Sequence, residues 1–306
     1  MAEAAATAAE AGGGTPTAVA GDQEDQAAAH CYVCLRTGAE SDDDPLLPSS
    51  SCCACRGGSH VHAQCLIQAA RHNPMRWEKC SVCKQPYHGE VKMVLARARW
   101  DEVSDLPEHD QARMNAANAL AGGLQATGDF AAALPLFKQA LDASRRVLGN
   151  ESLGTLASVH NLAALHLDMD DLGLALPLAT EALRGYIDQL GLENERTLDT
   201  MHLAAEIQSG IGNGGAAISL AQNVLERRRR LLGGASADTL SSINLLANLH
   251  TEAGNHAAAL PLYEEDLAGS RQTLGPSHPD TLIAMQACAA AHVRLRGDYT
   301  HALPLL

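Results

Sequence analysis

The chain has 306 residues and a formal charge of −14, and 46% of its residues are hydrophobic but only 3% are aromatic. A core with so few rings must close-pack small aliphatic side chains, which suits stacked helices better than a sandwich or a barrel. The acidic balance excludes nucleic acid as an expected partner because it repels phosphate, and the lack of any run of 18 apolar residues predicts no membrane span.

Residues 1–29 are rich in Ala, Gly and Glu and have no hydrophobic periodicity, so we expect a disordered tail. This start has no basic residues and no leucine-rich stretch, which is not typical of a signal peptide. Nine cysteines in a chain without an export signal favour metal ligands over disulfides. We therefore expect a reducing compartment, the cytoplasm, with the nucleus as the alternative.

Residues 30–88 contain eight of the nine cysteines, and the metal-binding residue types here fall into four closely spaced pairs. The pairs are Cys31 with Cys34, Cys53 with Cys55, His62 with Cys65, and Cys80 with Cys83. Structural zinc takes four such ligands in a tetrahedron, so eight ligands predict two Zn²⁺ ions. Because apolar residues are few in this segment, we expect metal binding and folding to be one event.

The ligand assignment leaves alternatives. Cys52 could replace Cys53, and His60 could replace His62. A PHD finger has the same order of ligands, which would make the module a reader of histone tails. The Pro-, Ser- and Asp-rich residues 41–51 are predicted to form a loop inside the module.

The order of ligands, together with the stretches CACRGGSHVHAQCL and WEKCSVCKQPYHG, resembles the RING-CH (RING variant) fingers of the MARCH family of ubiquitin ligases. That family usually has Trp four residues after the sixth ligand, where this chain has Ala69. The resemblance implies a crossed brace. In that brace one zinc is held by Cys31, Cys34, His62 and Cys65, and the other by Cys53, Cys55, Cys80 and Cys83.

The same resemblance implies a partner and a mode of action. RING-type ligases dock a ubiquitin-charged conjugating enzyme and hold its thioester in a reactive pose, without a covalent intermediate. No residue is therefore expected to be catalytic in the covalent sense. By resemblance, Val33 would be an apolar docking contact and Lys84 would steady the donor ubiquitin; the alternatives are local packing and a solvated lysine.

Residues 89–111 change from basic to acidic and are interpreted as a connector. From residue 112 to residue 306 the chain repeats with a period of 42. Leu-Gly pairs begin at Leu148, Leu190, Leu232 and Leu274, and one equivalent position holds Pro135, Pro177, Ser219 and Pro261. A fixed period over four copies predicts a solenoid of stacked units.

Each unit is predicted to contain two helices. In the second unit a first helix opens at Thr155, a polar turn covers residues 168–171, and a second helix runs from Leu172 to Leu190 and stops at Gly191. The proline inside the second helix predicts a mild kink. The pattern TLASVHNLAALH…LALPLATEALRGYIDQLG resembles the 42-residue tetratricopeptide repeats of kinesin light chains. The overall expectation is a mainly α chain: a small two-zinc cross-brace finger joined to an α-helical solenoid.

A ladder of polar residues lies on the expected first helices at steps of 42, on the side that lines the concave face of such solenoids. It consists of Asn118, His160, His202, Asn244 and Gln286. In kinesin-light-chain-like repeats Asn is common here, and such residues can hold the backbone of a ligand peptide. The ladder is thus a candidate partner-binding groove, with ordinary solvated surface as the alternative.

The run from Arg227 to Arg230 ends a predicted helix, where cations favour the helix dipole; a site for an acidic partner is the alternative. Taken together, the sequence favours a ubiquitin ligase in which the finger recruits a conjugating enzyme and the repeats bind the substrate. The alternative is a non-catalytic zinc-finger and repeat scaffold for protein–protein interaction.

Overall fold

A computed structural model describes residues 46–48, 60–73, 77, 79, 80, 87 and 89–296. The chain divides into two compact units, Met1–Pro86 and Tyr87–Leu306, and each is described by itself. Of the predicted zinc ligands, Cys31, Cys34, Cys53, Cys55 and Cys83 lie outside the described residues, as do Val33 and Lys84 and the expected tail.

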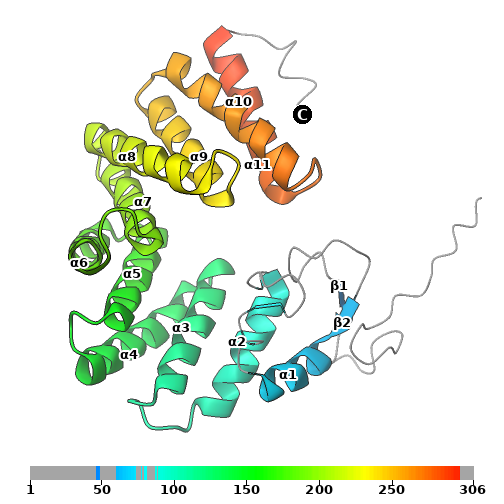
Figure 1. Cartoon of the computed structure of the whole chain (residues 1–306), viewed down its shortest axis with the longest axis vertical. Coiled ribbons are helices and arrows are strands. Elements are labelled where there is room, and N and C mark those ends of the chain that lie inside the picture. Colours follow the sequence, from blue (N-terminus) through cyan, green and yellow to red (C-terminus); the bar gives the residue numbers. More distant parts are fainter. Residues whose placement is uncertain are drawn as a thin grey trace, which may run out of the picture. The chain divides into compact units, whose positions relative to one another are not determined.

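The described part of the first unit is a short hairpin followed by a helix (Figure 1). Strand β1 (Leu46–Pro48) pairs antiparallel with β2 (His60–His62), with Leu46 opposite His62. Helix α1 (Ala63–His72) follows directly and buries Leu66, Ile67 and Ala70. The segment predicted as a loop, residues 41–51, therefore contains a strand.

Helix α2 (Gly89–Val103) occupies most of the segment that we interpreted as a connector. It buries Val91, Leu95 and Val103 and packs against the first repeat helix, α3. The approach is close at Gly123 of α3, where a Cβ atom would lie 3.2 Å from Met93 Cε. The segment was hard to recognise because its charged residues lie among these apolar ones and it falls outside the 42-residue register.

The repeats form consecutive pairs of antiparallel helices, seen from green to red in Figure 1. The first helices are α3 (Gln111–Ala126), α5 (Leu153–Asp168), α7 (Glu195–Gly210), α9 (Ala237–Glu252) and α11 (Pro279–Arg296). The second helices are α4 (Phe130–Leu148), α6 (Leu172–Leu190), α8 (Gly214–Leu232) and α10 (His256–Thr273). The predicted bounds of α6 are confirmed, and the helices run through Pro135, Pro177 and Pro261.

Capping residues explain why the helices begin and end at steps of 42. Asp110, Ser152, Asn194 and Ser236 precede the first helices, and each side chain accepts a hydrogen bond from a backbone N–H of the first turn. Second helices α4, α6 and α8 end at glycines with φ near +80°, a conformation that costs glycine little.

Small side chains hold the two helices of a repeat close together. Ala133, Ala175, Ala217 and Ala259 occupy one position of the four second helices, and each is at most 1% exposed. A few larger residues, such as Phe137 and Tyr186, fill the remaining space of the core. This packing uses the alanine-rich, ring-poor composition that the sequence analysis noted.

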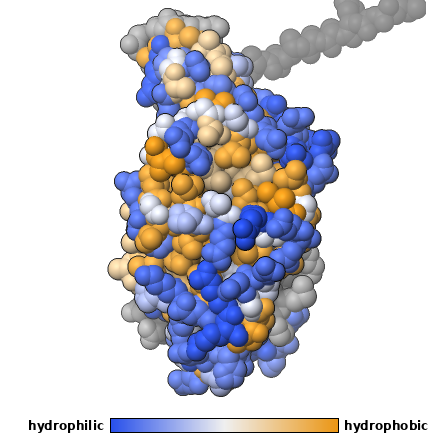
Figure 2. Space-filling view, turned by 90° about the vertical axis from the view of Figure 1, so that its left-hand side faces the viewer, coloured by the Kyte–Doolittle hydropathy of each residue, from blue (hydrophilic) through white to orange (hydrophobic). Residues whose placement is uncertain are grey.

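Successive first helices also contact one another, α3 with α5, α5 with α7 and α7 with α9. They form the closely spaced inner layer of the array, and the second helices form its outer layer. The face on the left of Figure 1 carries hydrophobic residues among hydrophilic ones (Figure 2). Leu174 and Leu232 are two large hydrophobic residues that are about half exposed. No helix in the described part of the chain is long and apolar enough to span a membrane.

Candidate functional site

The predicted polar ladder lies on the inner layer, with one residue on each first helix. Asn118, His160, His202 and Asn244 are half-buried, whereas Gln286 on α11 is exposed. The five side chains are equivalent in register, but the structure gives them different neighbours. Their chemistry therefore has to be considered one repeat at a time.

The first two ladder residues bind the next repeat of the same chain. Asn118 Nδ2 donates to Ser158 Oγ at 3.3 Å, and His160 Nδ1 lies 3.0 Å from Thr200 Oγ1. Burial lowers the pKa of His160, so the neutral imidazole is the form that fits this contact. These two side chains join consecutive first helices, and Asn118 Oδ1 is buried without a hydrogen-bond partner among the described residues.

His202, the third ladder residue, has no such bond to the following first helix. Its Nε2 lies 3.7 Å from Glu206 Oε1 on the next turn of α7. Its Nδ1 is buried without a hydrogen-bond partner among the described residues. The residue equivalent to Thr200 is Ser242 on α9, and Ser242 is engaged elsewhere.

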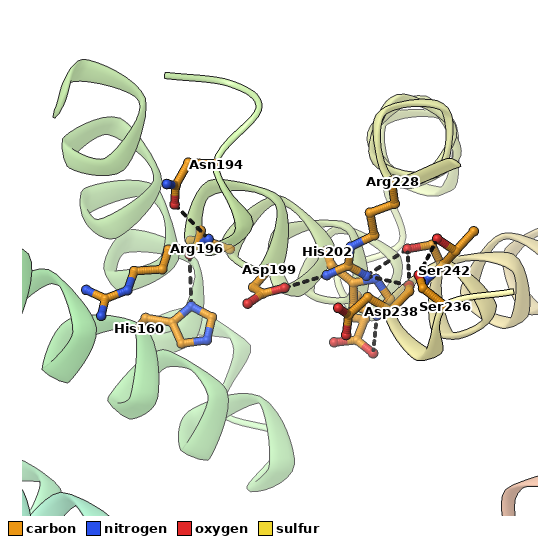
Figure 3. A network of polar contacts seen from close by, with 12 residues as sticks. His160, Asn194, Arg196, Asp199, His202, Arg228, Ser236, Asp238 and Ser242 are labelled. Carbon is orange, nitrogen blue, oxygen red and sulfur yellow. Dashed lines mark hydrogen bonds and ion pairs between the residues drawn. The ribbon is translucent and has the colours of Figure 1, made fainter. Parts of the chain in front are cut away.

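It is the side chain of Arg228, on α8, and not that of His202, that bonds to Ser242. Its Nη1 donates to Ser242 Oγ at 2.7 Å and to the Asp238 carbonyl at 2.9 Å, and its Nη2 lies 2.5 Å from Asp199 Oδ1. Figure 3 shows the side chain extending between Asp199 and Ser242. Because only 5% of the arginine side chain is exposed, this is a largely desolvated guanidinium with three internal acceptors.

The other arginines of the run also have acidic partners within the chain. Arg227 and Arg230 pair with Glu193, and Arg229 pairs with Glu265. The run is therefore occupied by internal ion pairs, which argues against the alternative of a site for an acidic partner.

The fourth ladder residue contacts a buried acid. Asn244 Nδ2 donates to Asp266 Oδ2 at 3.0 Å, and Ser270 Oγ donates to Asp266 Oδ1 at 3.3 Å. Asp266 is only 5% exposed, and burial raises the pKa of its carboxyl despite these two donors. The equivalent positions of the other second helices hold Ala140, Ala182 and Val224, so the acid belongs to this repeat and not to the repeat fold.

A cavity of about 360 Å³ opens beside these residues, between α7, α9, α10 and α11. Its lining includes the ladder residues His202 and Asn244 and the carboxylates of Glu206, Asp266 and Asp280. Two of the five predicted groove residues are thus brought together at a cavity, and the first two are engaged within the array. The sequence analysis missed Asp266 and Arg228. Both differ from the residues at equivalent positions of the other repeats, which are Ala, Ala and Val for Asp266 and Ser, Tyr and Ser for Arg228.

Three of the eight predicted zinc ligands fall in the described part of the chain. His62 ends β2 and Cys65 lies in the first turn of α1, so a strand-to-helix junction carries this pair. Cys80 is buried. Among the described residues there is no group of three or more His, Cys, Asp or Glu suited to a metal, and the remaining ligands lie outside them.

Two family models match the helical unit. Both are described as tetratricopeptide repeat, and they cover residues 112–188 and 239–280. No curated protein sequence matches the chain.

Solved structures of low sequence identity share the fold. A putative kinesin light chain from Podosopora anserina with nearly identical repeats is 24% identical, with a TM-score of 0.54 over 65% of this chain and 93% of that one. BtubC (BKLC) from P. vanneervenii is 22% identical, with a TM-score of 0.58 over 71% of this chain and 87% of that one. A Rap protein in complex with Competence and Sporulation Factor is 12% identical, with a TM-score of 0.56 over 79% and 68%. Residues 112–188 and 239–280 therefore match tetratricopeptide repeats, and the helical unit has the fold of an array of such repeats.

Proposed function

We propose that the inner layer of the repeats binds a segment of a partner protein and that the chain acts as a protein-interaction module. The observation that carries this proposal is the cavity at the α7–α11 end of the layer, which is lined by His202 and Asn244 from two consecutive repeats. A segment entering there would find amide, imidazole and carboxylate groups between apolar walls, which is the usual composition of a ligand site.

The Rap structure supports the same use of the fold, because that repeat protein was solved with Competence and Sporulation Factor bound. The likeness to it is one of fold, so the identity of the partner has to come from this chain's own residues. The test is affinity capture with the full chain, followed by the same capture with Asn244→Ala. Loss of the captured partner in the variant supports the inner layer as the site, and capture that Asn244→Ala leaves unchanged contradicts it.

We further propose that residues 30–88 bind two Zn²⁺ ions. The donor set fits, since seven thiols and one imidazole are the ligands that structural zinc prefers. The junction of β2 and α1 supports the assignment because it keeps His62 and Cys65 three residues apart on ordered elements. Bound zinc would supply folding energy to a segment with few apolar residues and would leave no open position for catalysis.

A finger of RING-CH type would make the whole chain a ubiquitin ligase whose repeats select the substrate. In that role Val33 and Lys84 would contact the conjugating enzyme and the donor ubiquitin, by the resemblance stated above. The decisive experiment is ubiquitin discharge from several charged conjugating enzymes, with the full chain and with Val33→Ala. Faster discharge that Val33→Ala abolishes supports the ligase. If no conjugating enzyme is accelerated, the scaffold function stands and the ligase function fails.

A further inference from the structure

The cavity at the α7–α11 end of the inner layer is acidic. Among the described residues its lining contains Glu206, Asp266 and Asp280 and no lysine or arginine. Glu206 lies 3.7 Å from His202 and Asp280 lies 3.6 Å from His278, whereas Asp266 has no such neighbour in the described part of the chain. The walls of the cavity are apolar where Leu240, Leu274 and Ile283 contribute. A cationic group that enters between these walls loses part of its hydration, so its attraction to the carboxylates of the cavity is stronger than it would be in water.

Asp266 is the most deeply buried of the three acids. Its two hydrogen-bond donors, Asn244 and Ser270, are both neutral, and it forms no ion pair with any described residue. A carboxylate buried in this way is expensive to ionise unless a cation approaches it. The position tolerates alanine or valine in the other repeats, so packing alone does not require an acid.

The preceding repeat shows which cation fits this geometry. Ser270 is equivalent in register to Arg228, and Ser241 and Asp280, which line the cavity, are equivalent to Asp199 and Asp238. Arg228 binds the Asp199 carboxylate, the Ser242 hydroxyl and the backbone carbonyl of Asp238. Ser242 is equivalent to Ala284, so the carboxylate available near Ser270 is that of Asp266, to which Ser270 is bonded. One repeat earlier, therefore, a guanidinium from the chain itself extends from the position equivalent to Ser270, and Figure 3 shows it beside Asp199 and Ser242. Ser270 instead lines the cavity.

We infer that the cavity binds the side chain of an arginine in the partner's segment, an inference that rests on the proposed binding of a protein segment by the inner layer. The arginine takes the place that Arg228 fills in the third repeat. Its planar guanidinium donates several hydrogen bonds at once, as Arg228 does to a carboxylate, a hydroxyl and a carbonyl, whereas an ammonium is a compact, strongly hydrated charge. Asp266 and Asp280 supply the carboxylates, and the small side chain of Ser270 leaves space for the guanidinium.

The probe for this site is Nα-acetyl-arginine methylamide, which has the side chain without backbone charges. It is titrated into the full chain and followed by NMR, beside the neutral citrulline analogue and the lysine analogue. We expect shifts of the Asn244 side-chain amide and of the Ser241 and Ser270 backbone amides, with binding at least tenfold weaker for citrulline and weaker for lysine. Equal responses to arginine and citrulline, or to arginine and lysine, overturn the inference.

Two variants locate the site. Ser270→Arg places an internal guanidinium where Arg228 has one, so it should abolish the response to the probe. Asp266→Asn keeps the shape, because its amide oxygen can accept from Asn244 Nδ2 while its amide nitrogen donates to Ser270 Oγ, and it should weaken binding at least tenfold. If Asp266→Asn binds the probe as the wild type does, the inference is wrong, whether or not Ser270→Arg folds.

The probe also separates this inference from the proposed function. A chain that captures a partner through the inner layer but ignores the arginine probe keeps the proposed function and loses the inference. A chain that binds the probe but captures no partner keeps the cavity as an arginine site and loses the proposed function.

Discussion

Arg228 and Ser270 lie at the same position of consecutive second helices, 42 residues apart, and they have opposite consequences for the inner layer. Arg228 reaches Asp199 and Ser242 and closes its repeat to ligands. Ser270 reaches only Asp266, one turn earlier on its own helix, and leaves a cavity of about 360 Å³. At this position, therefore, the third repeat places a guanidinium of the chain itself, whereas the fourth repeat has a small side chain that lines the cavity.

Replacement of Arg228 by methionine should lower the free energy of unfolding by about 2 kcal/mol, because it leaves Asp199 and Ser242 without a charged donor. Arg230→Met is the matched control. Arg230 and its partner Glu193 are each 55% exposed, and such pairs contribute about 0.5 kcal/mol or less. Urea unfolding followed by circular dichroism measures both variants. Equal losses would contradict the special role of Arg228.

The repeat fold could be predicted closely from the sequence because each unit carries its own start and stop signals. The ends of α6 follow from the polar turn before Leu172 and from Gly191 after Leu190, and the same signals recur every 42 residues. Helix α2 was missed because it lies outside that register and takes its burial from α3, as the contact of Met93 with Gly123 shows. The sequence of α2 alone does not indicate which helix it packs against.

The site could be predicted only in part. The ladder correctly placed a polar residue on each first helix, but it treated His160 and His202 as equivalent. They differ because the Thr200 hydroxyl bonds to His160, whereas the equivalent Ser242 hydroxyl accepts a hydrogen bond from Arg228 and none from His202. A pattern that recurs every 42 residues does not show how the neighbours of one repeat differ from those of the next. The informative residues were those that break it, Asp266 and Arg228, and their meaning depends on which neighbours the fold brings to them.

Asp170 offers a test of the turn between the two helices of a repeat. It has φ of 59°, and the equivalent positions are Gly128, Gly212 and Gly254 with φ between 76° and 84°. Because this left-handed conformation strains a residue with a Cβ atom, Asp170→Gly should raise the free energy of unfolding by about 1 kcal/mol. The reverse change, Gly212→Asp, should lower it by a similar amount. Both are read from the midpoint of urea unfolding at constant slope, and a destabilised Asp170→Gly would show that the Asp170 side chain has a role beyond the turn.

Zinc content tests the N-terminal module directly. Elemental analysis of the purified chain should give two zinc ions, and Cys80→Ser should reduce this number to one, because the resemblance places Cys80 in the second site. Cys288→Ser is the control. Cys288 is buried in α11, and burial raises the pKa of its thiol, as expected for an inert core cysteine. A chelator should remove both ions and leave the helical signal of α3–α11 intact. An unchanged metal content in Cys80→Ser would exclude Cys80 as a ligand.

The pH dependence of stability tests the state of Asp266. Its pKa is raised in the folded chain from a model-compound value of 3.8, so above that value the folded state holds a proton that the unfolded state has released. Stability therefore falls as pH rises from about 4 through the folded pKa, and the loss is complete above it. The negative charge of Asp280 also raises the pKa of Asp266, and Glu206 and His202 are the other titratable groups that line the cavity.

Asp266→Asn should remove this loss, because an amide keeps the contacts to Asn244 and Ser270 without a charge. The gain in melting temperature over the wild type should grow from near zero at pH 4 to a plateau near neutrality, as measured by circular dichroism. Asp142→Asn is the control, since Asp142 is exposed on α4 and is not part of the cavity lining, so this change should alter the profile little. A gain that is the same at every pH would mean that Asp266 affects packing and not charge. If saturating Nα-acetyl-arginine methylamide narrows the difference at neutral pH, the ligand supplies a positive charge next to Asp266.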